Sequence, residues 1–521
     1  MIHILADKRD AATTEIVVRA FERSFTRGQV RLIDAYQDIP TSNAVVIVVS
    51  PDDESAKMLG QLIRNRGKIV LQGSLGPAVG EIAGVETFAA APQFSEFAEC
   101  GPAPVHGTSQ SRASMVYSDS GIGTASCLRR RHFVRFDFSN EWNNLGYGRI
   151  GFGEDRWSIA QLASRFSAMV ADVRIDQTSS VGAAVTLLDL SFGSVLWFAR
   201  PAGAIDGQDW SVVENFISAH RANELPCRPF LRGIPHGFGA AVSMRLDCDE
   251  DIASARQLYD LYRSRNYPLS LAVMTGQPDS PENRSLMRDV LDAGGSILSH
   301  SATHAADWGG SGEAAEREAR DSRAWLEKNI SGLKVRYAVS PFHQNPSYVP
   351  GALARAGYDG FIGGSIAGDP EYLMARGGAA PFGPAGMISH SQSCMLHGDC
   401  MLAGDDRLRV FKEAFALARD SGEFFGYLDH PFSERYTYGW PDEETRLAAH
   451  SDYLDFLESA SGNGGLLFVN EDTCMQFIKE KASAEIAFDV VQEKYEITKT
   501  SAAGFPMSLG YHGEVLEAQR D

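Results

Sequence analysis

The first hundred residues alternate short apolar runs with segments of helical periodicity. Ile2–Leu5 is a short apolar run, and Ala11–Phe25 repeats apolar residues every three or four positions, which predicts a strand followed by a helix. The alternation continues with predicted strands at Val30–Ile33, Ala44–Val49 and Lys68–Gln72 and a predicted helix at Glu54–Arg66. Strands that alternate with helices favour a parallel sheet, so we expect an N-terminal doubly wound α/β domain.

The best candidate for a domain boundary lies near residue 232. Strands are predicted at Gly182–Leu190 and Gly193–Ala199 and a helix at Trp210–His220, before Pro226, Pro229 and Pro235 punctuate the segment around Cys227–Phe238. Such a proline-rich segment typically separates domains. We therefore assign residues 1–232 to the first domain, whose pattern resembles the flavodoxin or glutamine-amidotransferase architecture. No G-x-C-x-G or G-x-S-x-G nucleophile motif occurs in it, so we expect a binding or scaffolding role.

A second series of strands and helices follows the prolines. Its predicted strands are Ala240–Leu246, Leu269–Met274, Ser296–Ser299, Val335–Val339 and Phe361–Gly363, and its predicted helices are Ile252–Arg265, Glu282–Ala293, Gly312–Asn329 and Gly351–Ala356. Repeated βα units over this length indicate a (β/α) barrel, with fewer than eight units as an alternative to the full ring. We assign residues 233–485 to this domain. Residues 486–521 alternate only weakly and form a C-terminal extension that can add strands.

Composition and charge exclude several classes of partner. The chain of 521 residues is 44% hydrophobic and 22% charged, which is ordinary for a globular protein of two or three domains. Its formal net charge of −19 would repel nucleic acid and anionic membranes. No run approaches the ~18 apolar residues of a membrane span, and the N-terminus meets charge too early for a signal peptide. We therefore expect a cytoplasmic protein whose seven scattered cysteines are reduced.

Charged residues share one face of the first strand in the second series. Side chains alternate along a strand, so Arg245, Asp247 and Asp249 lie on the same face. Groups at the C-terminal end of a barrel strand are typically catalytic. Taken alone, however, the Asp-x-Asp pair fits an acidic loop that caps the next helix equally well.

Two histidines follow the predicted strand Ser296–Ser299. His300 and His304 have the i, i+4 spacing that places side chains on one face of a helical turn, close enough to chelate one cation. A single histidine is usually structural, but a pair with this spacing directly after a strand favours a metal site. A later polar stretch holds further candidate ligands, which fit a substrate loop or plain surface better than a second metal site: His390, His397, Asp399 and Cys400.

Four ordered motifs within residues 237–478 resemble those of the polysaccharide deacetylase family, also called the NodB-homology family or carbohydrate esterase family 4. His300–His304 resembles its H-[S/T]-x-x-H motif, and Asp247–Asp249 resembles its Asp-x-Asp motif. Ser340–His343 is similar to its Arg-Pro-Pro-Tyr/Phe motif, and Gly426–Pro431 is similar to its late Leu-x-His motif. The resemblance implies a deformed (β/α) barrel of NodB-homology type.

The resemblance also implies a metal site. In the family, the second aspartate and the two histidines ligate a divalent cation, which corresponds here to Asp249, His300 and His304. Zinc is the first expectation, with cobalt or nickel as alternatives. One carboxylate and two imidazoles leave coordination positions open for water and substrate, as in catalytic zinc sites.

Proton transfer and oxyanion stabilisation are implied for the remaining motif residues. Asp247 corresponds to the general base and His430 to the general acid. Pro341 would shape the cleft, and Phe342 would supply a backbone N–H to the oxyanion.

The chain departs from the family at two places. Val339 stands where the family has an arginine that pairs with the base. Arg245 precedes Asp247 by two residues on the same strand face, and we hypothesise that it has taken over this pairing. The aspartate and tryptophan that usually orient the general-acid histidine have no clear counterpart in the sequence.

The leading functional hypothesis is removal of an N-acetyl group from an amino sugar in a glycan or glycan precursor. A metal-dependent amidase for a small non-sugar substrate, as in allantoinase-like relatives, is the first alternative. A catalytically silent carbohydrate-binding protein is the second, although the intact motif residues argue against it. The sugar, the native metal and the oligomeric state stay open.

Overall fold

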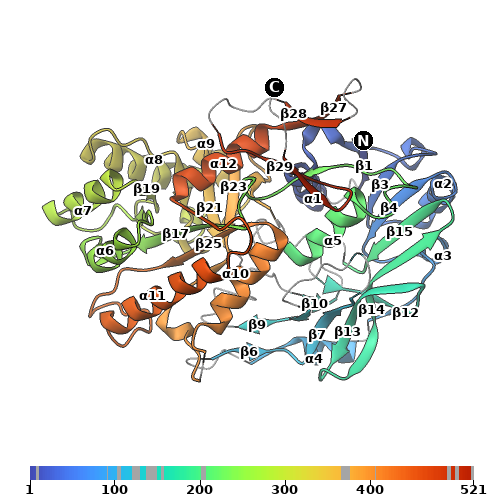
Figure 1. Ribbon diagram of the computed structural model, residues 1–521, viewed down its shortest axis with the longest axis horizontal. Helices are drawn as coiled ribbons and strands as arrows, with labels where there is room; N and C mark the ends of the chain where they lie inside the picture. The colour runs from blue at the N-terminus through green and yellow to red at the C-terminus, as the bar shows by residue number, and fades with distance from the viewer. Residues whose placement is uncertain are drawn as a thin grey trace.

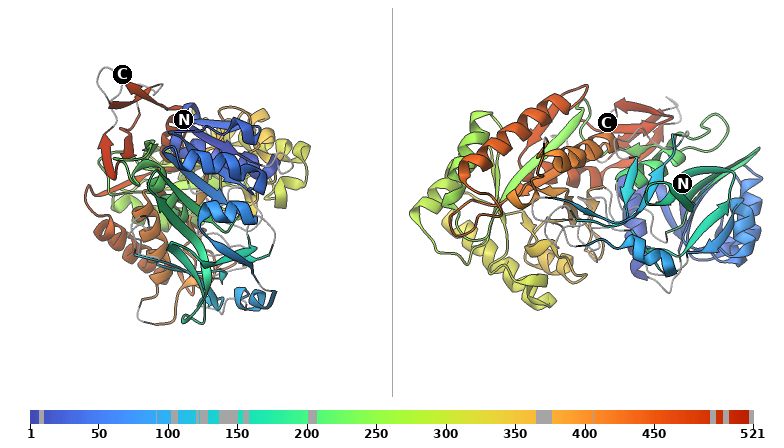
Figure 2. Two further views of the ribbon diagram at one scale, coloured as in Figure 1. Left: turned by 90° about the vertical axis from the view of Figure 1, so that its right-hand side faces the viewer. Right: turned by 90° about the horizontal axis from the view of Figure 1, so that it is seen from below.

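The computed structural model describes residues 1–6, 11–90, 92–101, 107–119, 122, 129–136, 150–153, 158–200, 207–364, 376–404, 406–489, 494–498 and 504–517. The N-terminal half, blue to teal in Figure 1, lies beside a C-terminal half that runs from green to orange. Figure 2 shows the same two halves from the side and from below. Among the described residues, no helix has the length and apolarity needed to cross a membrane.

The N-terminal half begins as the βα pattern predicts. Parallel strands pair in the order β2-β1-β3-β4, namely β1 (Ile2–Leu5), β2 (Val30–Ile33), β3 (Val45–Val49) and β4 (Gly67–Gln72). Every residue of β3 is buried, which explains its uninterrupted apolar sequence. The helices of this half are α1 (Ala11–Phe25), α2 (Ala56–Ile63), α3 (Pro77–Ala83), α4 (Ser95–Ala98) and α5 (Gly207–Ser218).

The same sheet then continues into an antiparallel region, where the sequence predicted strands only at Gly182–Leu190 and Gly193–Ala199. β15 (Gly193–Phe198) pairs in parallel with β4, and its other neighbour β14 (Ser179–Leu190) is antiparallel. The sheet extends through β13 (Ala168–Ile175), β7 (Ala113–Tyr117) and β8 (Arg130–His132). Shorter strands are β5 (Glu86–Ala89), β6 (Ser109–Gln110), β9 (Arg135–Phe136), β10 (Gly151–Phe152), β11 (Ser158–Ile159) and β12 (Gln161–Arg165). The sheet is therefore mixed, parallel strands make up only part of it, and the doubly wound architecture stays a prediction.

The C-terminal half is built on a curved sheet of parallel strands. In pairing order, these are β23 (Ile388–Gln392), β21 (Gly360–Gly364), β20 (Tyr337–Val339), β19 (Ser296–Ser299), β18 (Ser270–Val273), β17 (Ala240–Cys248) and β25 (Phe424–Asp429). Further strands are β22 (Gly378–Ala379), β24 (Cys394–Met395) and β26 (Leu466–Val469). The helices are α6 (Arg256–Ser264), α7 (Pro281–Asp292), α8 (Gly312–Asn329), α9 (Val349–Arg355), α10 (Arg409–Ser421), α11 (Glu443–Ala460) and α12 (Glu471–Ser483).

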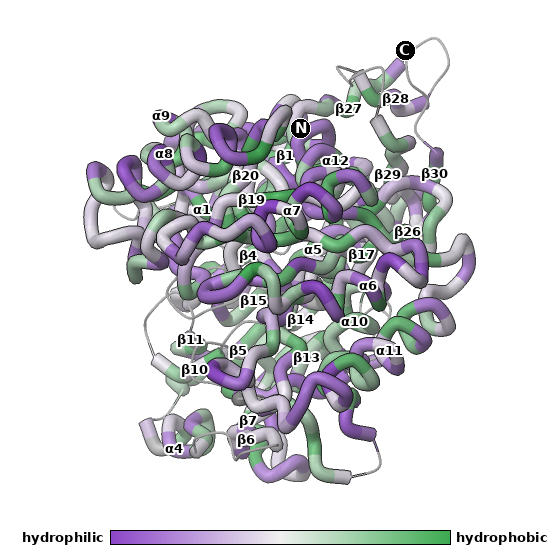
Figure 3. The backbone as a smooth tube through the Cα atoms, turned by 90° about the vertical axis from the view of Figure 1, so that its left-hand side faces the viewer, coloured by the Kyte–Doolittle hydropathy of each residue, from purple (hydrophilic) through white to green (hydrophobic). Residues whose placement is uncertain are grey.

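One segment closes this sheet into a deformed barrel. β23 pairs with β21, and the same segment continues directly into β24, which pairs with β25 on the other side. Between them, the Ser393 N–H donates to the Gly426 carbonyl over 2.8 Å. Outer helices such as α8 carry hydrophilic stretches, whereas apolar colour follows the strands in Figure 3. The apolar positions of α8 face inward, with Ala315, Ala319 and Leu326 buried.

The C-terminal extension adds strands, as its weak alternation suggested. β27 (Glu485–Asp489) and β28 (Lys494–Thr498) form a hairpin. β29 (Ser508–Tyr511) pairs with β30 (Glu514–Glu517) and with β16 (Phe230–Leu231), the strand just before the predicted boundary at residue 232. Leu509 and Ile497 belong to the same apolar cluster as barrel residues such as Leu298. The extension is therefore packed onto the barrel.

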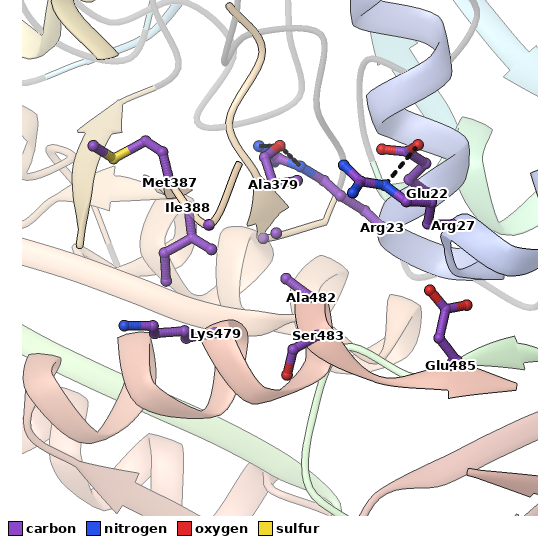
Figure 4. A pocket seen from close by; sticks show the side chains of 13 residues that line it. Glu22, Arg23, Arg27, Ala379, Met387, Ile388, Lys479, Ala482, Ser483 and Glu485 are labelled. Atoms are coloured by element: carbon purple, nitrogen blue, oxygen red, sulfur yellow. Dashed lines mark hydrogen bonds and ion pairs between the residues drawn. The ribbon is translucent and has the colours of Figure 1, made fainter. Parts of the chain in front are cut away.

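The two halves meet through buried charges. Arg23 on α1 donates to the carbonyl oxygens of Arg376 and Ala379 and to Ser389 Oγ, all in the barrel half. Arg376 in turn donates to both oxygens of Glu214 on α5, over 2.7 and 3.2 Å. Beside Arg23, a cavity of about 360 Å³ lies between α1, β22–β23 and α12 (Figure 4). Its charged lining is engaged in pairs such as Glu22 with Arg27.

Candidate active site

Strand β17 delivers the acidic residues to the C-terminal end of the barrel. Arg245 and Asp247 are both buried, at 0% and 2% relative exposure, and Asp249 follows at the strand's end. The alternation expected along the strand is thus preserved up to its end.

Arg245 and Asp247 form a two-point ion pair. Nε donates to Oδ1 over 2.6 Å and Nη2 donates to Oδ2 over 3.1 Å. Burial by itself would raise the pKa of the Asp247 carboxyl, but the Arg245 guanidinium and the neighbouring His300 lower that pKa to about 2. The contact confirms the pairing predicted from the sequence. Val339, at the position of the missing arginine, takes part through its backbone, because its carbonyl accepts a 3.0 Å hydrogen bond from His300 Nδ1.

Three side chains converge on one point beside this pair. His300 Nε2 lies 3.2 Å and His304 Nε2 lies 3.6 Å from Asp249 Oδ1, and the two Nε2 atoms are 3.1 Å apart. Asp249, His300 and His304 together offer ligand atoms that all lie within 4.8 Å of one another. Asp249 and His304 are 18% and 19% exposed, so one side of the cluster is open to solvent. One carboxylate and two imidazoles with an open side fit a catalytic divalent cation.

The protonation states of Asp249 and His304 suit such a cation, whereas Asp247 and Asp249 raise the pKa of the third ligand, His300, against the effect of its burial. Burial opposes ionisation of Asp249, yet hydrogen bonds from His300 and His430 hold its pKa well below the usual range. Burial and the adjacent His300 lower the pKa of His304 to about 4. An ionised carboxylate and a neutral imidazole are the forms that bind metals. The His300 Nδ1 bond to the Val339 carbonyl leaves Nε2 directed at the cluster.

The loop that carries the two histidines is not helical. We expected the i, i+4 spacing to act through a helical turn, and that expectation is wrong. Residues 300–304 form an irregular loop in which Ser301 and His304 have left-handed φ values of 63° and 56°. The imidazoles meet because the loop folds back on itself, with the His304 N–H donating to Ser301 Oγ over 2.9 Å.

The Ser340–His343 motif lies against the cluster. Pro341 is buried, and Phe342 has a left-handed φ of 51° in the short 3₁₀ helix Pro341–His343. The Phe342 ring centroid is 4.5 Å from that of His304. This places Phe342 beside the expected metal position, while its role as an oxyanion donor stays a prediction.

His430 follows β25 and approaches the cluster from a second strand. Its Nε2 lies 3.4 Å from Asp249 Oδ2. Its Nδ1 is hydrogen-bonded to His397 Nε2 over 2.8 Å, and Tyr438 stacks on its ring at 4.0 Å with an interplanar angle of 12°. The sequence showed no counterpart for the aspartate and tryptophan that orient this histidine in the family. In the structure, His397 and Tyr438 contact the His430 ring.

The backbone of His430 is held by a buried network. Asp429 Oδ1 accepts from the His430 N–H over 2.7 Å, and Arg446 Nη2 donates to the His430 carbonyl over 2.6 Å. Asp429 Oδ2 contacts Arg446 Nε and His450 Nε2 at 2.7 and 3.0 Å. His397, Asp429 and His430 also have ligand atoms close together. Because Arg446 neutralises the carboxylate and both of its oxygens already accept hydrogen bonds, this group acts as a hydrogen-bond network.

The later polar stretch, predicted to be a substrate loop or plain surface, is mostly buried. His390, His397 and Cys400 are buried, whereas Asp399 is exposed. In the described part of the chain, these four do not form one group of possible ligands. His397 instead belongs to the support of His430. Sequence reasoning also missed Tyr438, Arg446 and Glu318, since no local spacing links them to the motifs that they contact.

Comparison with known proteins adds fold-level similarity only. No protein family and no curated protein matches the chain by sequence. The solved structure of Agd3, a novel carbohydrate deacetylase, is 10% identical, covers 98% of this chain and 92% of its own, and has a TM-score of 0.40. A chitin deacetylase from the fungal pathogen Colletotrichum lindemuthianum is 14% identical over 47% of this chain and 89% of its own, with a TM-score of 0.32.

A family 4 acetyl xylan esterase from Clostridium thermocellum, in complex with a cobalt ion, is 15% identical over 45% of this chain and 90% of its own, with a TM-score of 0.29. These similar structures are thus carbohydrate deacetylases and esterases. Because the TM-scores lie below 0.5, the function is argued from the residues of the site.

Proposed function

We propose that this chain is a metal-dependent hydrolase that removes an N-acetyl group from an amino sugar in a glycan or glycan precursor. The observation that carries the proposal is the juxtaposition of two proton-transfer groups with one ligand cluster. Asp247 Oδ2 lies 4.0 Å from His300 Nε2, and His430 Nε2 lies 3.4 Å from Asp249 Oδ2. A base and an acid that flank a cation site are the parts required to cleave an amide.

Each residue has a distinct task in this proposal. Asp249, His300 and His304 would hold the cation, with zinc as the first expectation. When bound, the cation would polarise the acetyl carbonyl and acidify the attacking water. Arg245 keeps Asp247 ionised, so that Asp247 can accept the proton of that water.

The departing nitrogen needs a proton, because an unprotonated amine is a poor leaving group. His430 is placed to supply this proton through Nε2, while His397 and Tyr438 fix its ring. Phe342 would contribute its N–H to the developing oxyanion. The glycan substrate follows from the motif resemblance, and a small cyclic amide is the first alternative substrate.

Two measurements on the purified protein test the proposal. Metal analysis should give one equivalent of divalent cation, which His300→Ala and His304→Ala variants should lose together with activity. Acetate release should be seen with N-acetylated amino sugars or their oligomers. Full metal occupancy in the double histidine variant would refute the ligand assignment, and turnover of a cyclic amide without acetate release would favour the amidase alternative.

The same assays should distinguish the general acid and base from the metal ligands. Asp247→Asn and His430→Ala should retain the cation but lose about 10²- to 10⁴-fold in kcat, the usual contribution of one proton-transfer group. Near-normal kcat in either variant would mean that the role given to that residue is wrong.

A further inference from the structure

The loop His300–His304, here called the metal loop, holds two residues in an unfavourable backbone conformation. Ser301 and His304 are both left-handed without being glycine. Such residues persist only when surrounding contacts compensate for their strain, and they commonly mark functional sites. Since no helix fixes this loop, other contacts must hold His300 and His304 in the geometry that brings their Nε2 atoms to 3.1 Å.

The two ends of the loop have evident supports. The His300 N–H donates to the Val273 carbonyl of β18 over 2.9 Å, and the His300 ring donates to the Val339 carbonyl. At the other end, the His304 N–H is bound to Ser301 Oγ. A further bond, from the Thr275 N–H to the Ser301 carbonyl, is 3.2 Å long, and none of these contacts reaches Ala302 or Thr303.

Glu318 supports the middle of the loop. Its Oε2 accepts from the N–H groups of Ala302 and Thr303 over 3.0 and 2.8 Å, and its Oε1 accepts from Thr303 Oγ1 over 2.8 Å. A charged acceptor forms stronger hydrogen bonds than a neutral one. Among the described residues, Glu318 has no ion-pair partner, and both of its carboxylate oxygens accept hydrogen bonds from the loop.

Helix α8 makes Glu318 a rigid support. Ser311 caps the helix by accepting from the Ala314 N–H, and Ala315 and Ala319, on either side of Glu318, are buried against the barrel. Glu316, on the same helix, does not take part in this support; it forms an ion pair with Arg355 over 2.7 Å.

We propose that Glu318 is a positioning residue that shapes the metal loop so that His300 and His304 can bind one cation together. The inference rests on the proposed metal site and adds the element that organises it. Without the carboxylate, Ser301 and His304 can leave their left-handed conformations. Binding of a cation must then re-form the strained loop, and the free energy needed for this lowers the affinity.

Affinity for zinc, measured by competition with a chromogenic chelator, tests this role. Glu318→Ala should weaken zinc binding about 10- to 100-fold, the usual effect of removing a residue that orients ligands. Glu318→Gln should lose less, since an amide oxygen can still accept from the two N–H groups. Thr303→Val, which removes only the contact to Oε1, should cause a smaller loss, and Glu316→Ala should leave the affinity unchanged.

The melting temperature of the zinc-free protein separates positioning from folding. We expect Glu318→Gln and Thr303→Val to melt, without zinc, as the Glu316→Ala control does. Unchanged zinc affinity in Glu318→Ala would overturn the inference, as would equal losses in Glu318→Ala and Glu316→Ala. If instead the unmodified chain binds no zinc at His300 and His304, the proposed function itself fails.

Discussion

Val339 and Arg245 show how a side chain can be replaced from another strand. The guanidinium that pairs with Asp247 comes from two residues earlier on β17, where the alternation of side chains points it along the same face. Val339 needs no polar side chain, because its carbonyl already orients His300. Asp247 is therefore paired by a side chain of its own strand, β17, while β20 contributes a carbonyl to the site.

Removing this guanidinium should shift the pH dependence of catalysis. Asp247 acts when ionised, so activity is lost as the pH falls through its pKa. Arg245 lowers that pKa, and in an Arg245→Met variant burial would raise it instead. The acidic limb of the pH–rate profile should therefore move to higher pH, and kcat should fall while the metal content is kept. Arg336→Met, a change just before β20, is the control and should leave the profile in place.

The contact between His397 and His430 predicts a dependence on the leaving group. If His397 orients the acid, His397→Ala should slow the hydrolysis of an N-acetyl amine, whose nitrogen must be protonated, much more than that of 4-nitrophenyl acetate, whose leaving group needs no proton. The ratio of the two kcat values measures this effect. Equal losses on both substrates would show that His397 only maintains the fold or the metal site.

At the level of strands and helices, the predictions from sequence succeeded where burial alone dictates structure. β3 is a continuous apolar run, and β4 and β19 have apolar centres, because all residues of these strands are buried; such runs are visible in any single sequence. The pairing of Arg245 with Asp247 was predictable for a similar reason, since it depends only on alternation within one strand.

Features that depend on distant contacts could not be predicted. The metal loop takes its shape from Glu318 on α8, and the ring of His430 is fixed by His397 and Tyr438 from separate loops. The antiparallel region from β7 to β14 was missed because its register is set by pairing rather than by local periodicity. These contacts cannot be inferred from the spacing of residues in the sequence.

Helix α12 begins with a buried carboxyl that should limit stability at alkaline pH. Glu471 is fully buried, and its loss of hydration raises its pKa to about 7, although Arg245 opposes this rise. A pKa raised on folding favours the folded state at low pH, and this contribution is lost as the pH rises from about 4.5 through 7. At pH 8 the penalty is on the order of 3 kcal/mol.

Glu471→Gln should remove this penalty while keeping an acceptor for the 2.7 Å hydrogen bond from Gln392. The melting temperature of the variant should therefore fall less between pH 5 and pH 8 than that of the unmodified protein. Glu444→Gln, at an exposed position on α11, is the control and should follow the unmodified protein. An unchanged pH dependence in Glu471→Gln would show that the buried carboxyl is not responsible.

In the molecule as a whole, buried ion pairs contribute to the interface between the halves. Glu214 and Arg376 are each 2% exposed, and Arg376 also lies 2.9 Å from Glu423. Removing one member of such a pair leaves a charge buried without its full complement. Glu214→Ala should therefore lower the free energy of unfolding by about 3 kcal/mol, measured by urea denaturation. Glu224→Ala, which breaks an exposed pair with Arg221, should cost less than about 1 kcal/mol.

The two sides of this interface are synthesised at different times. Arg23 emerges from the ribosome 356 residues before Ala379 of β22, whose carbonyl accepts its hydrogen bond. At typical elongation rates, α1 waits roughly 20 to 70 seconds for that partner. During this interval Arg23 and Glu214 can stay hydrated, whereas apolar groups in their place would favour aggregation. Charged residues at these two positions thus protect the N-terminal half until the barrel half has been synthesised.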